Sequence, residues 1–177
     1  MRSLLILAAV VFPMATFAAG SSSSAPPKQT KTTTICHGGQ VWDSKTKRCL
    51  DAKESRLRDE TRYGAVRELA YAGRYDDALY VLSAMSDQTE SRVLTYYGFV
   101  HRKAGRIDLG MKFYTAALEA DPDNLLARSY MGQGLVTAGD LRGARIQLAE
   151  IRSRDGANSW PETSLHKAIV SGTTYSY

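Results

Sequence analysis

The chain has few of the residues that usually carry catalysis or bind metals. Its 177 residues include two cysteines, three histidines and two tryptophans. His37, His101 and His166 lie in three separate regions of the sequence, and no serine or cysteine stands within a nucleophile motif. The sequence therefore favours a protein that is not an enzyme, and it predicts no cofactor and no metal site.

Charge of one sign does not dominate the sequence. Lys and Arg number 23 against 18 Asp and Glu, which gives a net charge of +5. This mild basic bias suits an acidic partner surface or an anionic lipid. It is too small to indicate nucleic-acid binding.

A long apolar run occurs only near the N-terminus. Arg2 precedes the unbroken apolar stretch Leu4–Phe12, Pro13 interrupts it, and small residues follow as far as Ala19. This pattern is typical of a secretory signal peptide over residues 1–19. A periplasmic or secreted location is therefore expected, with no stable membrane insertion after cleavage. The alternative is an uncleaved anchor, although the uncharged stretch Ser3–Ala19 has only seventeen residues, which barely span a bilayer.

Two segments of different composition follow. Residues 20–35 are rich in Ser, Thr, Pro and Lys and show no apolar periodicity, which predicts a flexible linker. Cys36 and Cys49 are the only cysteines, and in an exported chain they are expected to form a disulfide across a short hairpin within residues 36–50. Zinc is the alternative, but His37 is the only further ligand nearby.

From residue 55 onward the pattern becomes helical and repeats. A turn containing Ala-Gly recurs at Gly73, Gly105 and Gly139, at intervals of 32 and 34 residues. Glycine can end a helix in the left-handed conformation, and a small residue lets two helices approach closely. Such a small residue stands five positions after each glycine, at Ala78, Gly110 and Ala144.

These features resemble the tetratricopeptide repeat (TPR). Residues 91–124 have the 34 positions of the family's repeat. They carry its signature residues at Leu94, Tyr97, Gly98, Gly105, Ile107, Gly110, Tyr114, Ala117 and Pro122. Residues 125–154 follow as another unit, and residues 59–90 precede as a shorter one. The resemblance implies an all-α solenoid of three helix hairpins over residues 55–154, with a capping helix over residues 160–172, preceded by the small disulfide loop.

In this family the first helix of each hairpin lines a concave groove that binds a protein or peptide. The corresponding positions in this sequence are Tyr63, Arg67, Tyr71, Arg92, Thr95, Phe99, Arg102, Lys103, Ser129 and Gln133. Their mixture of aromatic rings and cations predicts a partner segment that carries acidic residues. The alternative is that they are ordinary solvated side chains.

The resemblance thus implies a protein–protein interaction scaffold in the periplasm or cell envelope. Three hairpins give a shallow groove, which is expected to bind with modest affinity or to allow self-association. The alternative function is an envelope or polysaccharide-associated protein whose Cys36–Cys49 loop binds while the repeats serve as a spacer. Trp42 with Lys45, Lys47 and Arg48 would then contact a sugar polymer or an anionic surface. The alternative is that Trp42 covers the disulfide and has no binding role.

Overall fold

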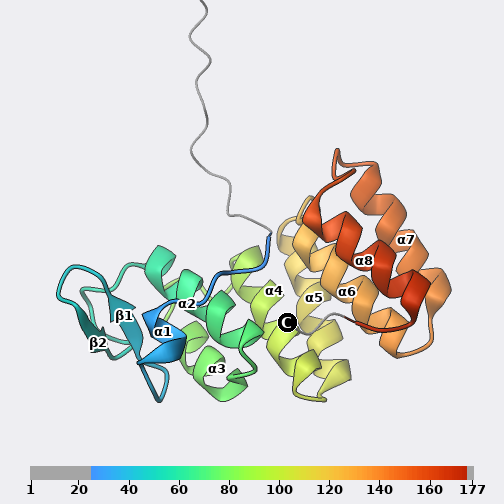
Figure 1. Ribbon diagram of the computed structural model, residues 1–177. Coiled ribbons are helices and arrows are strands. Elements are labelled where there is room, and N and C mark those ends of the chain that lie inside the picture. Colours follow the sequence, from blue (N-terminus) through green and yellow to red (C-terminus); the bar gives the residue numbers. More distant parts are fainter. Residues whose placement is uncertain (1–24, 175–177) are drawn as a thin grey trace, which may run out of the picture.

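The computed structural model describes residues 25–174, so the predicted signal segment lies outside the described part of the chain. Eight helices and two strands occur within these residues, and the predominantly helical character is confirmed (Figure 1). In chain order they are α1 (Lys31–Thr34), β1 (Val41–Asp43), β2 (Arg48–Leu50), α2 (Asp59–Tyr71), α3 (Tyr75–Ser83), α4 (Ser91–Lys103), α5 (Ile107–Ala120), α6 (Leu125–Thr137), α7 (Leu141–Arg152) and α8 (Trp160–Ser171).

Three glycine turns fold consecutive helices back on one another. Gly73, Gly105 and Gly139 follow α2, α4 and α6 with φ of 75°, 83° and 82°, a conformation that glycine adopts at little cost. In each turn the amide of the next residue donates to the carbonyl five residues earlier, at 2.8–2.9 Å, which satisfies a carbonyl in the last turn of the helix. The turns therefore pair α2 with α3, α4 with α5, and α6 with α7.

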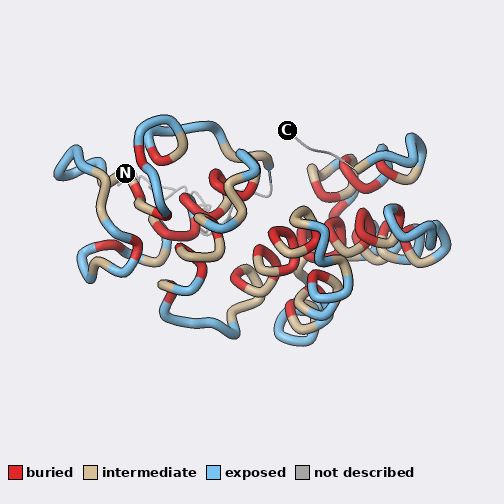
Figure 2. The backbone as a smooth tube through the Cα atoms, turned by 90° about the horizontal axis from the view of Figure 1, so that it is seen from below, coloured by how far each residue is buried: buried red, intermediate tan, exposed pale blue. Residues whose placement is uncertain are grey.

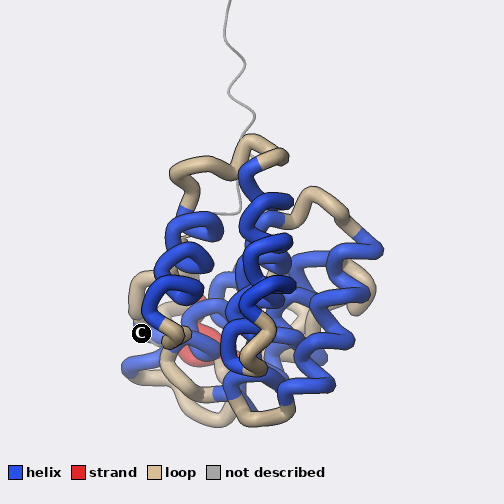
Figure 3. The backbone as a smooth tube through the Cα atoms, turned by 90° about the vertical axis from the view of Figure 1, so that its right-hand side faces the viewer, coloured by secondary structure: helices blue, strands red, loops and turns tan. Residues whose placement is uncertain are grey.

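Each of the two later hairpins packs through its first helix on both helices of the hairpin before it, so that α4 contacts α2 and α3, and α6 contacts α4 and α5. Helix α6 also contacts α8. Figure 3, seen from the side of α7 and α8, shows helices packed against one another and joined by short loops at their ends. The buried residues follow the inward sides of the helices, as the red segments of Figure 2 show. Below, the first-helix face means the side of the molecule formed by α2, α4 and α6, the first helices of the three hairpins, together with α8.

α4 and α5 approach each other closely at two glycines. A Cβ atom on Gly110 would stand 2.8 Å from the carbonyl oxygen of Gly98 and 2.9 Å from the amide nitrogen of Arg102. Real Cβ atoms do not approach backbone this closely, so two glycines are required for this contact. Tyr114, which is fully buried, packs beside Gly98. The small residue predicted at position 110 thus has a direct steric cause.

The N-terminal module contains the expected disulfide. Cys36 and Cys49 are bonded, with their Cα atoms 5.6 Å apart, which excludes the alternative zinc site at these thiols. β1 and β2 pair antiparallel, with Trp42 opposite Cys49. Val41 is buried in the main core, so the module packs onto the helices through one face of its hairpin.

The prediction of a flexible linker over residues 20–35 is wrong for its last part. Thr32 in α1 is buried, and its neighbours Thr30 and Thr33 both bind the carboxylate of Glu68 in α2. Four donors reach this carboxylate, the two amides at 2.6 and 3.1 Å and the two hydroxyls at 2.7 and 2.5 Å. Composition alone missed this anchor because the acceptor lies 38 residues beyond Thr30.

Replacing Glu68 with Ala should release α1 from α2. The substitution removes a buried charged acceptor from four donors, which should cost about 2–3 kcal/mol of local stability. Hydrogen exchange of the amides in residues 30–34 measures the effect, and Glu119→Ala, which removes an exposed carboxylate, is the control. Unchanged protection of these amides in the Glu68→Ala protein would contradict the assigned role.

Candidate functional site

Most of the predicted groove residues do not line an open surface. Tyr63, Thr95, Phe99, Arg102, Ser129 and Gln133 are all buried. The prediction of an exposed groove is therefore wrong at Phe99, Arg102, Ser129 and Gln133, whereas Tyr63 and Thr95 line a pocket described below. Arg67, Tyr71, Arg92 and Lys103 keep partial exposure.

Helix α8 is one reason for this burial. Its Ser164 lies against α6, with hydroxyl oxygens of Ser164 and Ser129 3.0 Å apart. Leu165 fills the space over Gly132, where an added Cβ would stand 2.6 Å from the leucine side chain. Helix α8, which the sequence predicted as a cap at the end of the stack, thus also covers much of the part of the first-helix face that α6 forms.

Aromatic stacking is the second reason. Tyr71 stacks on Phe99 with ring centroids 5.3 Å apart, and Phe99 lies 4.8 Å from Tyr130. The hydroxyls of Tyr71 and Tyr130 are 2.6 Å apart, so one donates to the other. Burial raises the pKa of Tyr71 to about 12, which keeps its phenol neutral at physiological pH. These rings join α2, α4 and α6 as core, whereas the resemblance to the repeat family implied that Tyr71 and Phe99 lie on a binding surface.

A small cavity remains beside these rings. Its volume is about 120 Å³, and its walls include Tyr71, Phe99, Lys103, Gln133 and Trp160. Ligand sites usually have about 300–1,000 Å³, so this cavity is too small for a peptide segment. The centre of the first-helix face is therefore filled.

Arg102 lies buried close to this centre, between α4, α5 and α6. Its Nε donates to the hydroxyl of Tyr114 at 3.3 Å, and its guanidinium stands 5.7 Å from the ring centroid of Phe99. The Nη2 atom is buried and makes no hydrogen bond within residues 25–174. Burial and the Arg102 charge both lower the pKa of Lys103, the next residue. Arg102 thus acts as a structural cation and does not offer its charge to a surface ligand.

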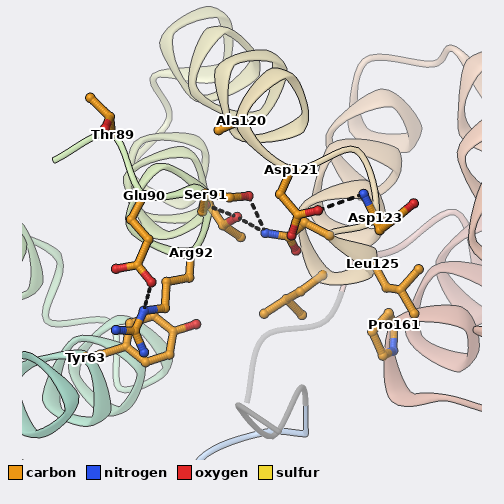
Figure 4. A pocket seen from close by; sticks show the side chains of 13 residues that line it. Tyr63, Thr89, Glu90, Ser91, Arg92, Ala120, Asp121, Asp123, Leu125 and Pro161 are labelled. Carbon is orange, nitrogen blue, oxygen red and sulfur yellow. Dashed lines mark hydrogen bonds and ion pairs between the residues drawn. The ribbon is translucent and has the colours of Figure 1, made fainter. Parts of the chain in front are cut away.

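A larger pocket opens at the N-terminal ends of α4, α6 and α8 (Figure 4). Its volume is about 670 Å³, within the range of ligand sites. All three hairpins and α8 contribute to its walls. The lining residues are Tyr63, Thr89, Glu90, Ser91, Arg92, Thr95, Ala120, Asp121, Asp123, Asn124, Leu125, Leu126 and Pro161. We call this the N-end pocket.

The charge of the N-end pocket is mainly negative. Its one cation, Arg92, lies 4.7 Å from the ring centroid of Tyr63 and pairs with Glu60 and Glu90, each at 2.5 Å. Asp121 and Asp123 line the opposite wall in Figure 4. Because Arg92 is already paired and Arg102 is buried, the expectation of an acidic partner loses its basis at both positions.

Asn124 fixes the shape of this pocket. Its side-chain oxygen accepts from the amide of Ala127 at 2.9 Å and caps α6. Its amide nitrogen donates to the hydroxyls of Ser91 and Thr95 at 2.8 and 3.0 Å. Asn124 was not predicted from the sequence to belong to the site, although an Asn directly before an apolar helical run is a known helix start signal. Its bonds to α4 depend on the tertiary contact.

Comparisons with family models, with curated proteins and with solved structures found no match to this chain. Within residues 25–174 no cluster of three or more His, Cys, Asp or Glu is arranged to hold a metal ion. None of the helices in this part of the chain is long and apolar enough to cross a bilayer. Function is therefore inferred from the geometry of the N-end pocket.

Proposed function

We propose that this protein is a non-catalytic binding protein, a short solenoid of three TPR-like hairpins that takes a segment of a partner protein in the N-end pocket. The observation that carries the proposal is the pocket's construction: one cavity of about 670 Å³ draws its walls from all three hairpins and from α8. A site of this kind exists only when the hairpins are stacked, so binding and stacking are linked.

The walls of the pocket favour a segment that is basic and partly apolar. Tyr63, Leu125, Leu126 and Pro161 supply apolar surface. Asp121 adds a carboxylate that forms no salt bridge within the described residues, while Glu90 pairs with Arg92 and Asp123 with Arg154. A Lys or Arg side chain can lay its apolar stem on such a surface while its charged end meets a carboxylate. This replaces the acidic partner expected from the sequence with a basic one.

Two substitutions should each weaken binding without affecting the fold. Ala120→Trp fills the pocket from its exposed rim, and Asp121→Lys reverses one of its charges. Each should weaken binding at least about tenfold, since a lost charge pair and a blocked contact each amount to about 1.4 kcal/mol or more. Ala149→Trp and Glu119→Lys make the same changes at exposed positions outside the pocket and are the matched controls.

The test selects peptides from a random twelve-residue phage library on the chain from residue 20 onward, then measures affinities by calorimetry. Selected peptides should be rich in Lys, Arg and apolar residues and should lose affinity for the two pocket variants alone. Acidic selected peptides, or equal losses in the control variants, would refute the proposal.

A further inference from the structure

The positive charge of the protein is concentrated in the N-terminal module. Residues 25–58 contain eight Lys and Arg against three Asp and Glu, whereas residues 59–177 contain 14 against 15. The module, about a fifth of the chain, therefore carries a net charge of +5 while the helical part is nearly neutral. The excess positive charge is therefore not spread evenly along the chain, although the composition of the whole chain gives no sign of this.

The cations of the module are available for contact with a partner. All eight are exposed: Lys28, Lys31, Lys45, Lys47, Arg48, Lys53, Arg56 and Arg58. Within the described residues, Arg56 with Glu54 is the only salt bridge that any of them forms. The other two carboxylates of the module accept hydrogen bonds from hydroxyl groups, Asp43 from Thr46 and Asp51 from Tyr80. The excess charge is thus not neutralised internally.

Apolar side chains stand among these cations. Trp42 and Cys49 form a cross-strand pair, and their side chains project from the face opposite to Val41, which is buried in the core. Trp42 is half-buried on this face, and the ammonium of Lys31 lies 4.5 Å from its ring centroid. Ile35, one helical turn after Lys31, is 50% exposed.

The module is held to the helices by a set of specific contacts. The disulfide joins Cys36 to β2, and Glu68 holds α1 through four hydrogen bonds. Arg74 in the first hairpin's turn also donates to the carbonyl of Cys36 at 2.9 Å. A surface fixed in this way loses little conformational entropy when it binds.

We propose that the disulfide module docks the protein onto an anionic lipid membrane surface, with Ile35 and Trp42 at the headgroup region and the surrounding lysines on lipid phosphates. Lysine offers a point charge without the bidentate geometry of arginine, so exposed lysines suit an anionic surface whose acceptors have no fixed arrangement. An aromatic and an aliphatic side chain beside them suit the boundary between headgroups and acyl chains. Acidic polymers offer the charge but no apolar layer, so the exposed Ile35 favours lipid. This site is separate from the N-end pocket, and neither proposal depends on the other.

The test is vesicle co-sedimentation of the chain from residue 20 onward, which contains all described residues and lacks the apolar run Leu4–Phe12. The protein should bind phosphatidylcholine vesicles containing about 30% phosphatidylglycerol at about 0.05 M salt, and should dissociate at about 0.5 M salt. It should not bind vesicles of phosphatidylcholine alone. Failure to bind the anionic vesicles would overturn the proposal.

Matched variants locate the contact. Lys45→Gln, Lys47→Gln and Arg48→Gln together should lower the partition coefficient by more than about tenfold, since each cation near an anionic surface contributes roughly fivefold. The control removes three exposed cations from the helices, Lys112→Gln, Arg142→Gln and Arg145→Gln, and should bind as the parent does. Equal losses in the two triple variants would mean that net charge alone matters and would overturn the assignment to the module.

A second pair of variants distinguishes lipid from polymer. Ile35→Ser should weaken vesicle binding several-fold, while Val170→Ser, at a 74% exposed apolar position in α8, should not. Dextran sulfate serves as the soluble polyanion. Stronger binding to dextran sulfate than to vesicles, together with no effect of Ile35→Ser, would assign the module to acidic polymers and overturn the proposal. Circular dichroism checks that each variant is folded.

Discussion

Replacing Gly110 with Ala is expected to destabilise the protein by about 2–3 kcal/mol, the cost of overpacking a tight contact. The added Cβ would meet the carbonyl oxygen of Gly98 at 2.8 Å and the backbone and Cβ of Arg102 at 2.9 and 3.0 Å. Backbone atoms cannot rotate away as a side chain can, so α4 and α5 must separate. For a chain of this size the melting temperature should fall by about 6–10 °C.

The matched control is the same substitution in a helix where nothing opposes it. Gly64 lies within α2, is exposed, and has no atom within 4 Å of the position its Cβ would take. Gly64→Ala should therefore stabilise the protein by about 0.5–1 kcal/mol, because alanine favours helix over glycine. Thermal unfolding of the two variants should show shifts of opposite sign. A neutral Gly110→Ala would show that the two helices do not approach as closely as described.

Gly110→Ala should also affect binding. Ser91 and Thr95 of α4 and Asn124 before α6 share hydrogen bonds at the wall of the N-end pocket. Separation of α4 from α5 shifts α4 relative to this wall. Peptide affinity should therefore fall even at temperatures where the variant remains folded, whereas Gly64→Ala should leave it unchanged.

Loss of the disulfide is the second change with a large expected effect. Replacing Cys36 and Cys49 with Ala should destabilise the N-terminal module by about 3 kcal/mol, the loop-closure entropy of a cross-link of this length. The two strands have only three residues each and a two-stranded hairpin is marginal alone, so the module should open locally. The hairpins from α2 to α7 should keep their helicity.

Limited trypsin digestion measures this opening, because Lys45, Lys47 and Arg48 lie in or beside the hairpin turn. Cleavage there should be much faster in the double variant and in the parent protein treated with a reductant. Reductant should have no effect on the double variant, since the chain contains no other cysteine. If cleavage rates do not differ, the packing of Val41 and the bonds to Glu68 suffice to hold the module. Opening should also remove vesicle binding, because the surface of Trp42 and Ile35 would no longer be held together.

The local features of the fold were predictable because their causes lie within a few residues. Gly73, Gly105 and Gly139 end helices through their own backbone conformation, and the bond that closes each turn spans five residues. The need for a small residue at position 110 follows from the same periodicity. The Cys36–Cys49 pairing was predictable by elimination, as the chain has two cysteines.

The site was predicted less well, because exposure depends on which segments of the chain cover a surface. Phe99 and Gln133 occupy positions that the repeat pattern assigns to a groove, yet Tyr71 covers the first and Ser164 lies beside the second. Asn124 and Asp121 were not predicted from the sequence to belong to a site, although both line the N-end pocket. Their place in a pocket depends on α4 and α6 lying side by side.

The sequence by itself determined the helical hairpins, the disulfide and the excess of positive charge, since each follows from residue type and short-range spacing. The tertiary structure alone decided which of these features remain accessible. α8 and the stacked tyrosines fill the middle of the first-helix face, which leaves the acidic N-end pocket open. The hydrogen bonds of Glu68 hold α1, which the sequence predicted as part of a flexible linker, against α2 and so attach the cationic module to the helices. Burial depends on contacts between residues that are distant in the chain, and a local pattern does not contain that information.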